Sequence, residues 1–154
     1  MSGDPIKDLD AAVGGLRAVI LAGENYRQEI ARVTGLGVTE TQAISYLAVH
    51  GDRGQNDLAA DLGLTSGAST ALIDRLERQG VAERYPHPHD RRRALVRLTA
   101  AGNRVVAASR DWLATSFQSF PAEELPQLAD CLQRIAADLR KASASASGEG
   151  GRDG

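Results

Sequence analysis

The chain has 154 residues, of which 42% are hydrophobic and 25% charged, and its formal net charge is -2. This length supports one well-buried domain and leaves little room for a second. No apolar run is long enough to span a bilayer, and the N-terminus carries no secretion signal, so we expect a soluble cytoplasmic protein without a membrane partner. The single cysteine, Cys131, excludes an intramolecular disulfide and a cysteine-based zinc site, and we expect it to pack as a small hydrophobic residue.

A long N-terminal helix is predicted over about residues 8–34, after a flexible stretch at 1–7. Its apolar residues recur at spacings of three and four and form one stripe, Leu9, Val13, Leu16 and Ile20. Three glycines inside the helix each cost roughly 1 kcal/mol relative to alanine. Tertiary or intersubunit packing must therefore hold this helix in place.

Three shorter helices are predicted next. The first stops at Gly51, the second runs from about Asn56 to Leu62, and the third is capped by Thr65 or Ser66 and ends at Gly80. Gly63 permits the tight turn that a helix-turn-helix requires. The residues expected to face inward are Ala43, Ile44, Leu47, Leu58, Ala59, Leu62, Leu72, Ile73 and Leu76.

Between the third short helix and residue 98 the pattern becomes that of a strand pair. Residues 81–85 and 94–98 are predicted to pair as a two-stranded wing, and residues 86–93 form a loop too polar to bury. Together with the helices, this gives a mainly α fold with a small β-wing, the layout of a winged helix-turn-helix.

Two further helices complete the prediction. Thr99 caps a long helix whose apolar side reaches Phe120, before Pro121. The last helix has the spacing of a helix that pairs with another, through Leu125, Leu128, Leu132, Ile135 and Leu139. Residues 142–154 are small and polar, so we expect them to be disordered.

Charge is distributed unevenly along the chain. Residues 75–97 carry seven arginines against three acidic residues, whereas residues 1–74 carry five basic against ten acidic residues. A basic patch on an otherwise acidic body suits a protein that offers one face to phosphate.

At this point the sequence resembles the MarR family of bacterial transcription regulators over about residues 8–141. The motifs that carry the resemblance are Gln42, Leu58-Ala59, Asp74-Arg75-Leu76-Glu77 with Gly80, Asp90-Arg91-Arg92, and Leu98-Thr99 with Gly102. The resemblance implies a DNA-binding lobe at about 38–100 between dimerisation helices at about 8–34 and 100–141. It implies an obligate homodimer that binds a palindromic operator in double-stranded DNA and represses transcription until a small molecule or oxidation releases it. The dimer interface is then expected at Leu9, Val13, Leu16, Ile20, Leu128, Leu132, Ile135 and Leu139.

The recognition helix is expected at 65–79. With its apolar residues inward, its outward positions near the N-terminus can reach base edges, and the alternative is an ordinary solvated helix face. Arg75 and Arg84 are equally open to a phosphate contact or a salt bridge. Gln55 and Asn56, at the start of the preceding helix, can bind a phosphate or simply cap that helix. The outward residues assigned to DNA are Thr65, Ser66, Gly67, Thr70 and Asp74.

The wing tip contains three consecutive arginines, Arg91, Arg92 and Arg93, after His89 and Asp90. Their mutual repulsion would be relieved by DNA phosphates, and the resemblance implies that Arg92 enters the minor groove while Asp90 orients it. A structural Asp90–Arg92 salt bridge is compatible with that role. His87 and His89 lack further ligands for a metal, so neither a metal nor another cofactor is expected.

Tyr26, Tyr46, His50 and Trp112 are candidates for an aromatic effector pocket, although core packing explains them equally well. Thiol sensing is not expected, because the N-terminal helix has no cysteine.

Two alternative functions were considered. Ala71 stands where many relatives place an arginine or another long polar residue, which favours a winged-helix dimer that serves as an interaction module or binds DNA without sequence preference. A hydrolase using His50, His87 or His89 is not expected, because the sequence contains no nucleophile elbow, phosphate-binding loop or complete ligand set.

Overall fold

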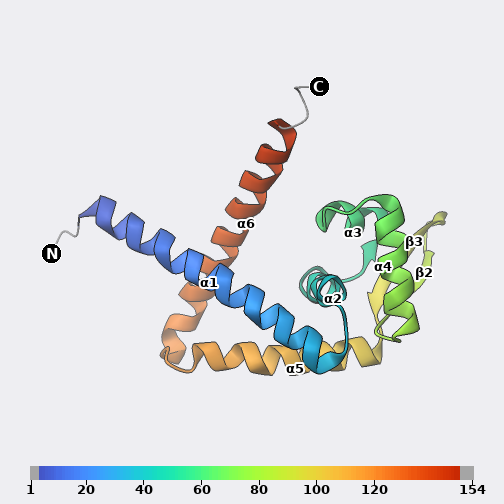
Figure 1. Cartoon of the computed structure of the whole chain (residues 1–154), viewed down its shortest axis with the longest axis horizontal. Coiled ribbons are helices and arrows are strands. Elements are labelled where there is room, and N and C mark those ends of the chain that lie inside the picture. Colours follow the sequence, from blue (N-terminus) through green and yellow to red (C-terminus); the bar gives the residue numbers. More distant parts are fainter. Residues whose placement is uncertain (1–3, 150–154) are drawn as a thin grey trace. The chain divides into compact units, whose positions relative to one another are not determined.

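A computed structural model describes residues 4–149, with side chains as far as residue 145. The chain divides into two compact units, Met1–Asp111 and Trp112–Gly154. Figure 1 shows the elements in chain order. The fold is mainly helical with one small antiparallel sheet, as predicted. Within the described residues, no helix is both long and apolar enough to cross a membrane.

The first unit begins with α1 (Pro5–Thr34), followed by α2 (Val38–His50). Helix α1 starts earlier than predicted, because the Asp4 side chain accepts a hydrogen bond from the Ile6 amide and Pro5 occupies the first turn. The flexible stretch expected at 1–7 is therefore wrong for residues 5–7, and residues 1–3 lie outside the described part.

The helix-turn-helix consists of α3 (Gln55–Asp61) and α4 (Ser66–Arg78). Gly63 between them has φ 65°, a left-handed conformation that favours glycine. The core of this unit contains the residues predicted to face inward, with only Leu62 remaining partly exposed. Its fully buried side chains include Leu58, Leu72, Ile73 and Leu76.

The sheet has three strands in the order β1-β3-β2, with β1 at Arg53–Gly54, β2 at Ala82–His87 and β3 at Asp90–Leu98. The sequence did not predict β1, and most of the loop expected at 86–93 is strand. The pairing continues to His87 and Asp90, with an irregularity after Pro86. A projecting hairpin needs no buried face, so polar residues can continue its ladder until a two-residue turn.

The sheet leads into α5 (Ala100–Ala114) through a tight junction. Thr99 Oγ1 donates to the Gly80 carbonyl at 2.6 Å and accepts from the Gly102 amide at 3.1 Å, which confirms its predicted capping role. A Cβ on Gly102 would lie only 2.0 Å from the Val81 carbonyl oxygen. Glycine is therefore needed here for close approach of two backbones.

The second unit contains the end of α5, two 3-10 turns (Thr115–Phe117 and Ala122–Glu124) and α6 (Leu125–Glu149). Helix α5 ends before Phe120, because the Thr115 hydroxyl donates to the Trp112 carbonyl at 2.6 Å and the chain tightens there. Cys131 is exposed in the single chain, so the prediction that it packs as a small hydrophobic residue is wrong for the single chain.

Helix α6 continues beyond residue 142, where we expected disorder. Alanines alternate with serines in this stretch, and alanine has the highest helix propensity. The hydroxyls of Ser143 and Ser145 donate to carbonyl oxygens one turn earlier, at 2.9 and 3.0 Å. The expected disorder is therefore wrong as far as Glu149, and residues 150–154 lie outside the described part.

Candidate nucleic-acid interface

Helix α4 has one buried and one exposed face. Thr65 caps it by accepting a hydrogen bond from the Ala68 amide at 3.2 Å, so of the two predicted caps, Thr65 and Ser66, it is Thr65. The positions predicted to point outward are exposed in the structure: Ser66, Gly67, Thr70, Ala71 and Asp74. Small side chains in the first turns leave the helix backbone open to close approach by a ligand.

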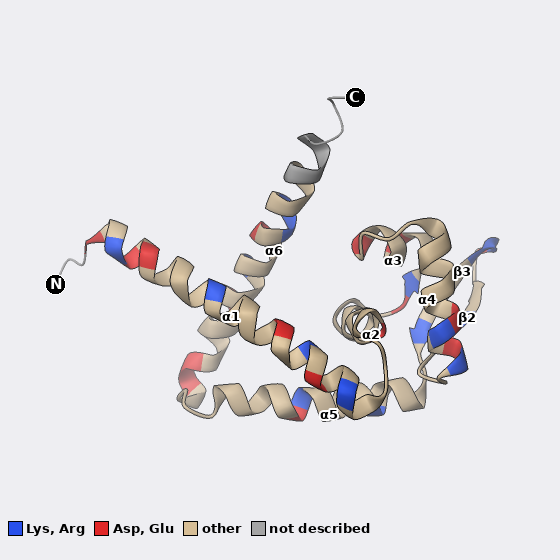
Figure 2. Ribbon diagram, in the orientation of Figure 1, with Lys and Arg blue, Asp and Glu red and all other residues tan. Residues whose placement is uncertain are grey.

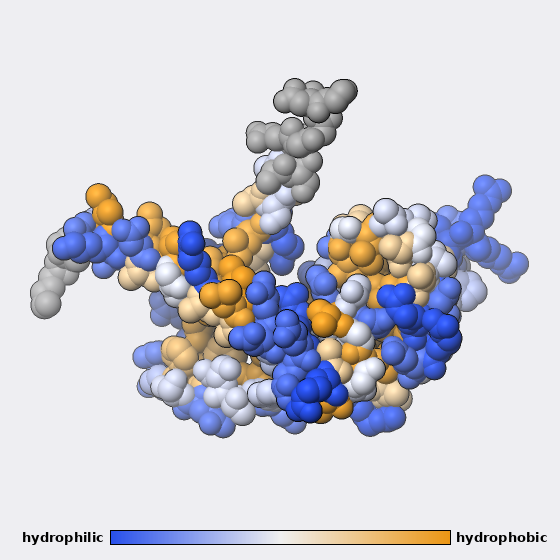
Figure 3. Space-filling model, in the orientation of Figure 1, coloured by the Kyte–Doolittle hydropathy of each residue, from blue (hydrophilic) through white to orange (hydrophobic). Residues whose placement is uncertain are grey.

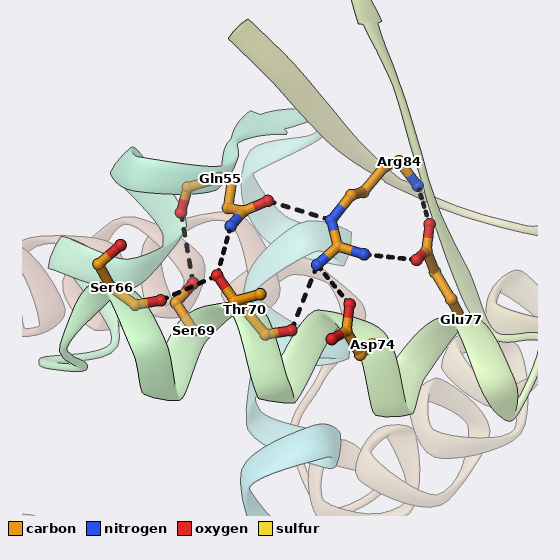
Figure 4. Close-up of polar contacts among 7 residues, drawn as sticks. All are labelled: Gln55, Ser66, Ser69, Thr70, Asp74, Glu77 and Arg84. Atoms are coloured by element: carbon orange, nitrogen blue, oxygen red, sulfur yellow. Dashed lines mark hydrogen bonds and ion pairs between the residues drawn. The ribbon is translucent and has the colours of Figure 1, made fainter.

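Arg84 of β2 lies against this helix and is surrounded by acceptors (Figure 4). Its guanidinium donates to Glu77 Oε2 at 2.5 Å, pairs with Asp74 Oδ1 at 2.7 Å and donates to the Thr70 carbonyl at 3.2 Å. Its Nε donates to Gln55 Oε1 at 3.1 Å. Only 24% of the Arg84 side chain is exposed. This geometry favours the salt-bridge alternative for Arg84.

Gln55 continues the network from α3. Its Nε2 donates to Thr70 Oγ1 at 3.0 Å, and the Thr70 hydroxyl donates to the Ser66 carbonyl at 3.0 Å. Gln55 thus links α3, α4 and β2, and the residue that caps α3 is Gly54 rather than Gln55 or Asn56.

Arg75 forms a second salt bridge, with Glu40 of α2. The Glu40 side chain is 8% exposed and the Arg75 side chain 41%. A carboxylate this deeply buried requires a charged partner. Arg75 therefore connects α4 to α2, in agreement with the salt-bridge alternative given for it.

Charged and aromatic side chains of β2 and β3 also contact one another on the exposed surface of the sheet. Arg97 donates to Glu83 at 2.8 Å and lies 4.6 Å above the Tyr85 ring, while the Tyr85 hydroxyl donates to Asp52 at 2.6 Å. The hydrogen bond to Asp52 raises the pKa of Tyr85, and the bond to Glu83 raises the pKa of Arg97. These contacts connect β2 and β3 to each other and to the segment before β1.

The wing tip differs from the rest of the sheet. Within the part of the chain whose side chains are described, Arg91 and Arg92 are exposed and form no ion pair, and Arg93 makes only a long contact with Asp57 at 3.4 Å. Asp90 Oδ1 accepts from the backbone amide of Arg92 at 3.0 Å, so it shapes the turn without a salt bridge to that side chain. Figure 2 shows this blue tip beyond the mixed charges at the base of the wing.

Hydrogen bonds, an ion pair and a shared hollow bring several of the proposed DNA contacts close together. A polar hollow of about 220 Å³ brings the start of α3 next to the wing, lined by Gly54, Gln55, Asn56, Arg92, Arg93 and Ala94. His89 is exposed, and its amide donates to His87 Nδ1 at 3.2 Å. No group of three potential metal ligands occurs among the described residues.

Two of the residues considered for an effector pocket lie next to each other on one helix. Tyr46 and His50 lie on α2 with ring centroids 4.2 Å apart, and burial, followed by a hydrogen bond to Asp61, raises the pKa of Tyr46. The Tyr26 hydroxyl bonds Ser109 of α5. Trp112 belongs to the second unit and is 42% exposed.

Sequence reasoning did not identify Glu40 as the partner of Arg75, nor Glu77 as a partner of Arg84. Glu77 lies one turn after Asp74 on α4, so both carboxylates face the same side of the helix. Two carboxylates at this spacing, followed by an arginine on the next strand, were a sequence signal for the salt bridges of Arg84. Glu40 gave no such signal, because its partner is 35 residues away.

These features define a winged helix-turn-helix with an exposed second helix and a cationic wing. Residues 34–93 match the model of the MarR family. YcgE, an uncharacterized HTH-type transcriptional regulator of Bacillus subtilis, is 38% identical over 77 residues. That alignment covers 49% of this chain and 50% of YcgE, so the chain matches about half the length of this relative. Over residues 34–93, the chain is therefore similar to the MarR family.

Solved structures give the same fold over most of the chain. A MepR mutant from a multidrug-resistant S. aureus clinical isolate has a TM-score of 0.71 at 22% identity and covers 83% of this chain and 96% of its own. An S. aureus MepR–DNA complex has a TM-score of 0.57 at 22% identity and covers 80% and 97%. At these identities the likeness concerns the fold alone.

Proposed function

We propose that this protein is a homodimeric transcription regulator that binds specific sequences in double-stranded DNA. The observation that carries the proposal is an exposed α4 face together with a wing tip where, among the described side chains, Arg91 and Arg92 have no acidic partner. A helix of this size fits the major groove, and arginines on an adjacent wing reach the neighbouring minor groove. The match of residues 34–93 to the MarR family model and the fold shared with an S. aureus MepR–DNA complex support the same function.

The proposed dimer rests on the apolar side chains that α1 and α6 expose in the single chain. Leu9 is 64% exposed, and Figure 3 shows apolar surface along α1. Exposed apolar side chains that recur along one helix mark an interface more often than a solvated face. The exposed residues that we assign to the dimer are Leu9, Val13, Ile20, Leu132, Ile135 and Leu139, with the half-buried Leu16 and Leu128 beside them.

Repression is the proposed mode of regulation. A dimer seated on two half-sites blocks the transcription machinery sterically. A small-molecule effector would act by changing the spacing of the two reading heads, so that both half-sites are no longer engaged together.

A second candidate is a winged-helix dimer that binds DNA without sequence preference or serves as an interaction module. Ala71 favours it, because this exposed position of α4 carries no group able to hydrogen-bond a base.

The proposed function is tested by measuring binding to the DNA upstream of the protein's own gene across a salt titration, with an unrelated duplex as competitor. We expect salt-sensitive binding that survives the competitor, because base contacts add to the phosphate term. Equal loss to any competitor contradicts sequence-specific binding at that site and favours the second candidate.

A further inference from the structure

Arg84, the arginine of β2 that lies against α4, is extensively paired within the protein. It has five N–H groups, and four contacts join its three nitrogens to Glu77, Asp74, the Thr70 carbonyl and Gln55. The backbone amide of Arg84 also donates to Glu77 Oε1 at 2.8 Å. A phosphate that bound this guanidinium would compete with the two carboxylates already paired to it.

The network also has a fixed direction. A guanidinium can only donate, so the Gln55 atom that faces Arg84 must be its oxygen, and the amide nitrogen must face Thr70. The Thr70 hydroxyl then accepts a hydrogen bond from Gln55 and donates one to the Ser66 carbonyl. Each polar group on this face therefore has a defined role as donor or acceptor.

These donor and acceptor roles determine which groups remain available to a ligand. Gln55 Nε2 has a second N–H to offer, Thr70 offers an oxygen lone pair and a methyl group, and Asp74, 52% exposed, offers a carboxylate oxygen. Acceptors on this face suit the amino groups of adenine or cytosine in the major groove, and the Thr70 methyl suits thymine.

We infer that Arg84 is a positioning residue, which orients Gln55 and Thr70 for base recognition and does not bind phosphate. This inference rests on the proposed function and assigns the source of its sequence preference. It separates affinity for any DNA, which the wing tip supplies, from discrimination between sequences, which the Arg84 network supplies.

The test compares two duplexes, one selected by the wild-type protein from a random pool and an unrelated one of equal length. The ratio of the two affinities measures discrimination, and the salt dependence counts phosphate contacts. Arg84→Ala and Arg84→Lys should each lower discrimination roughly tenfold and leave the salt slope unchanged. Lysine fails to rescue because it supplies a point charge without the planar fork.

A double-mutant cycle with Gln55→Ala separates positioning from general loss of structure. If Arg84 acts through Gln55, then Arg84→Ala should change discrimination little in the Gln55→Ala chain. Thr70→Val keeps the side-chain size and should also lower discrimination, without removing a charge.

Two results would overturn the inference. One is a smaller salt slope for Arg84→Ala together with rescue by Arg84→Lys, which indicates a phosphate contact. The other is full discrimination by both Gln55→Ala and Thr70→Val. If the wild-type protein binds both duplexes equally, the proposed function itself fails, and this outcome is recognised before any variant is made.

Discussion

The base and the tip of the wing contain the same residue type in opposite situations. At the base, Arg84 and Arg97 are held by acidic side chains and, for Arg97, by an aromatic ring. At the tip, Arg91 and Arg92 lie at the start of β3, just after the two-residue turn, without acidic partners within the described side chains. A paired arginine stabilises the protein, whereas an exposed, unpaired one is available to release counterions from DNA. Sequence composition alone cannot distinguish the two.

The largest expected effect concerns the tip. Replacing Arg91 and Arg92 together by alanine should lower affinity for any duplex on the order of 30- to 100-fold at physiological salt, because two phosphate-neutralising charges are lost. The salt slope should fall by about 0.9 for each arginine. Arg110→Ala, an exposed arginine of α5, is the matched control and should change neither quantity. Unchanged affinity of the double variant would remove the wing from the interface.

The junction behind the base provides the next largest effect. Gly102→Ala should lower the free energy of unfolding by about 2–3 kcal/mol, because the added Cβ would overlap the Val81 carbonyl. Urea unfolding measures the change. Gly67→Ala is the control: a Cβ there meets nothing within 4 Å, and the chain should gain up to about 1 kcal/mol. Equal stability of the two variants would show that the junction is not tightly packed.

A smaller effect is expected where α4 is tied to α2. Arg75→Ala leaves the buried Glu40 carboxylate without its partner and should cost about 1–2 kcal/mol, less than a fully buried pair because Arg75 is partly exposed. Adding Glu40→Gln should recover part of that loss, since it removes the unpaired charge. Thermal unfolding of the wild type, Arg75→Ala and the double variant measures these changes. A further loss of stability in the double variant would argue against the Arg75–Glu40 pair.

The smallest effect is expected at Arg97. Both members of its ion pair with Glu83 are about half exposed, so Arg97→Ala should lower the free energy of unfolding only slightly, and less than Arg75→Ala does. DNA affinity should hardly change, because this arginine belongs to the paired base. A loss of affinity comparable to that at the tip would extend the DNA-binding surface down the sheet.

Much of the fold could be predicted because hydrophobic periodicity and glycine positions are local signals. The three short helices, their buried residues and the Thr65 and Thr99 caps all follow from such signals. The errors concern elements that periodicity does not report. Strand β1 is only two residues long, and the outer part of the wing pairs through its backbone without burying a face.

The candidate site was predictable as a set of positions but not as a set of contacts. The sequence indicated Arg75 and Arg84 as basic residues near the recognition surface, one on α4 and one on β2, yet it left phosphate and salt bridge equally open. Only the folded chain brings Glu40 within reach of Arg75, and Asp74 and Glu77 within reach of Arg84. Pairing across the fold depends on tertiary distance, which a single sequence does not give.

The central claim, that the chain reads DNA sequence as a dimer, is tested most directly by selecting duplexes from a random pool with the wild-type protein. The account predicts enrichment of an inverted repeat whose half-site centres lie about one helical turn, or a multiple of it, apart. Failure to enrich any sequence, with binding that depends on salt alone, would contradict it.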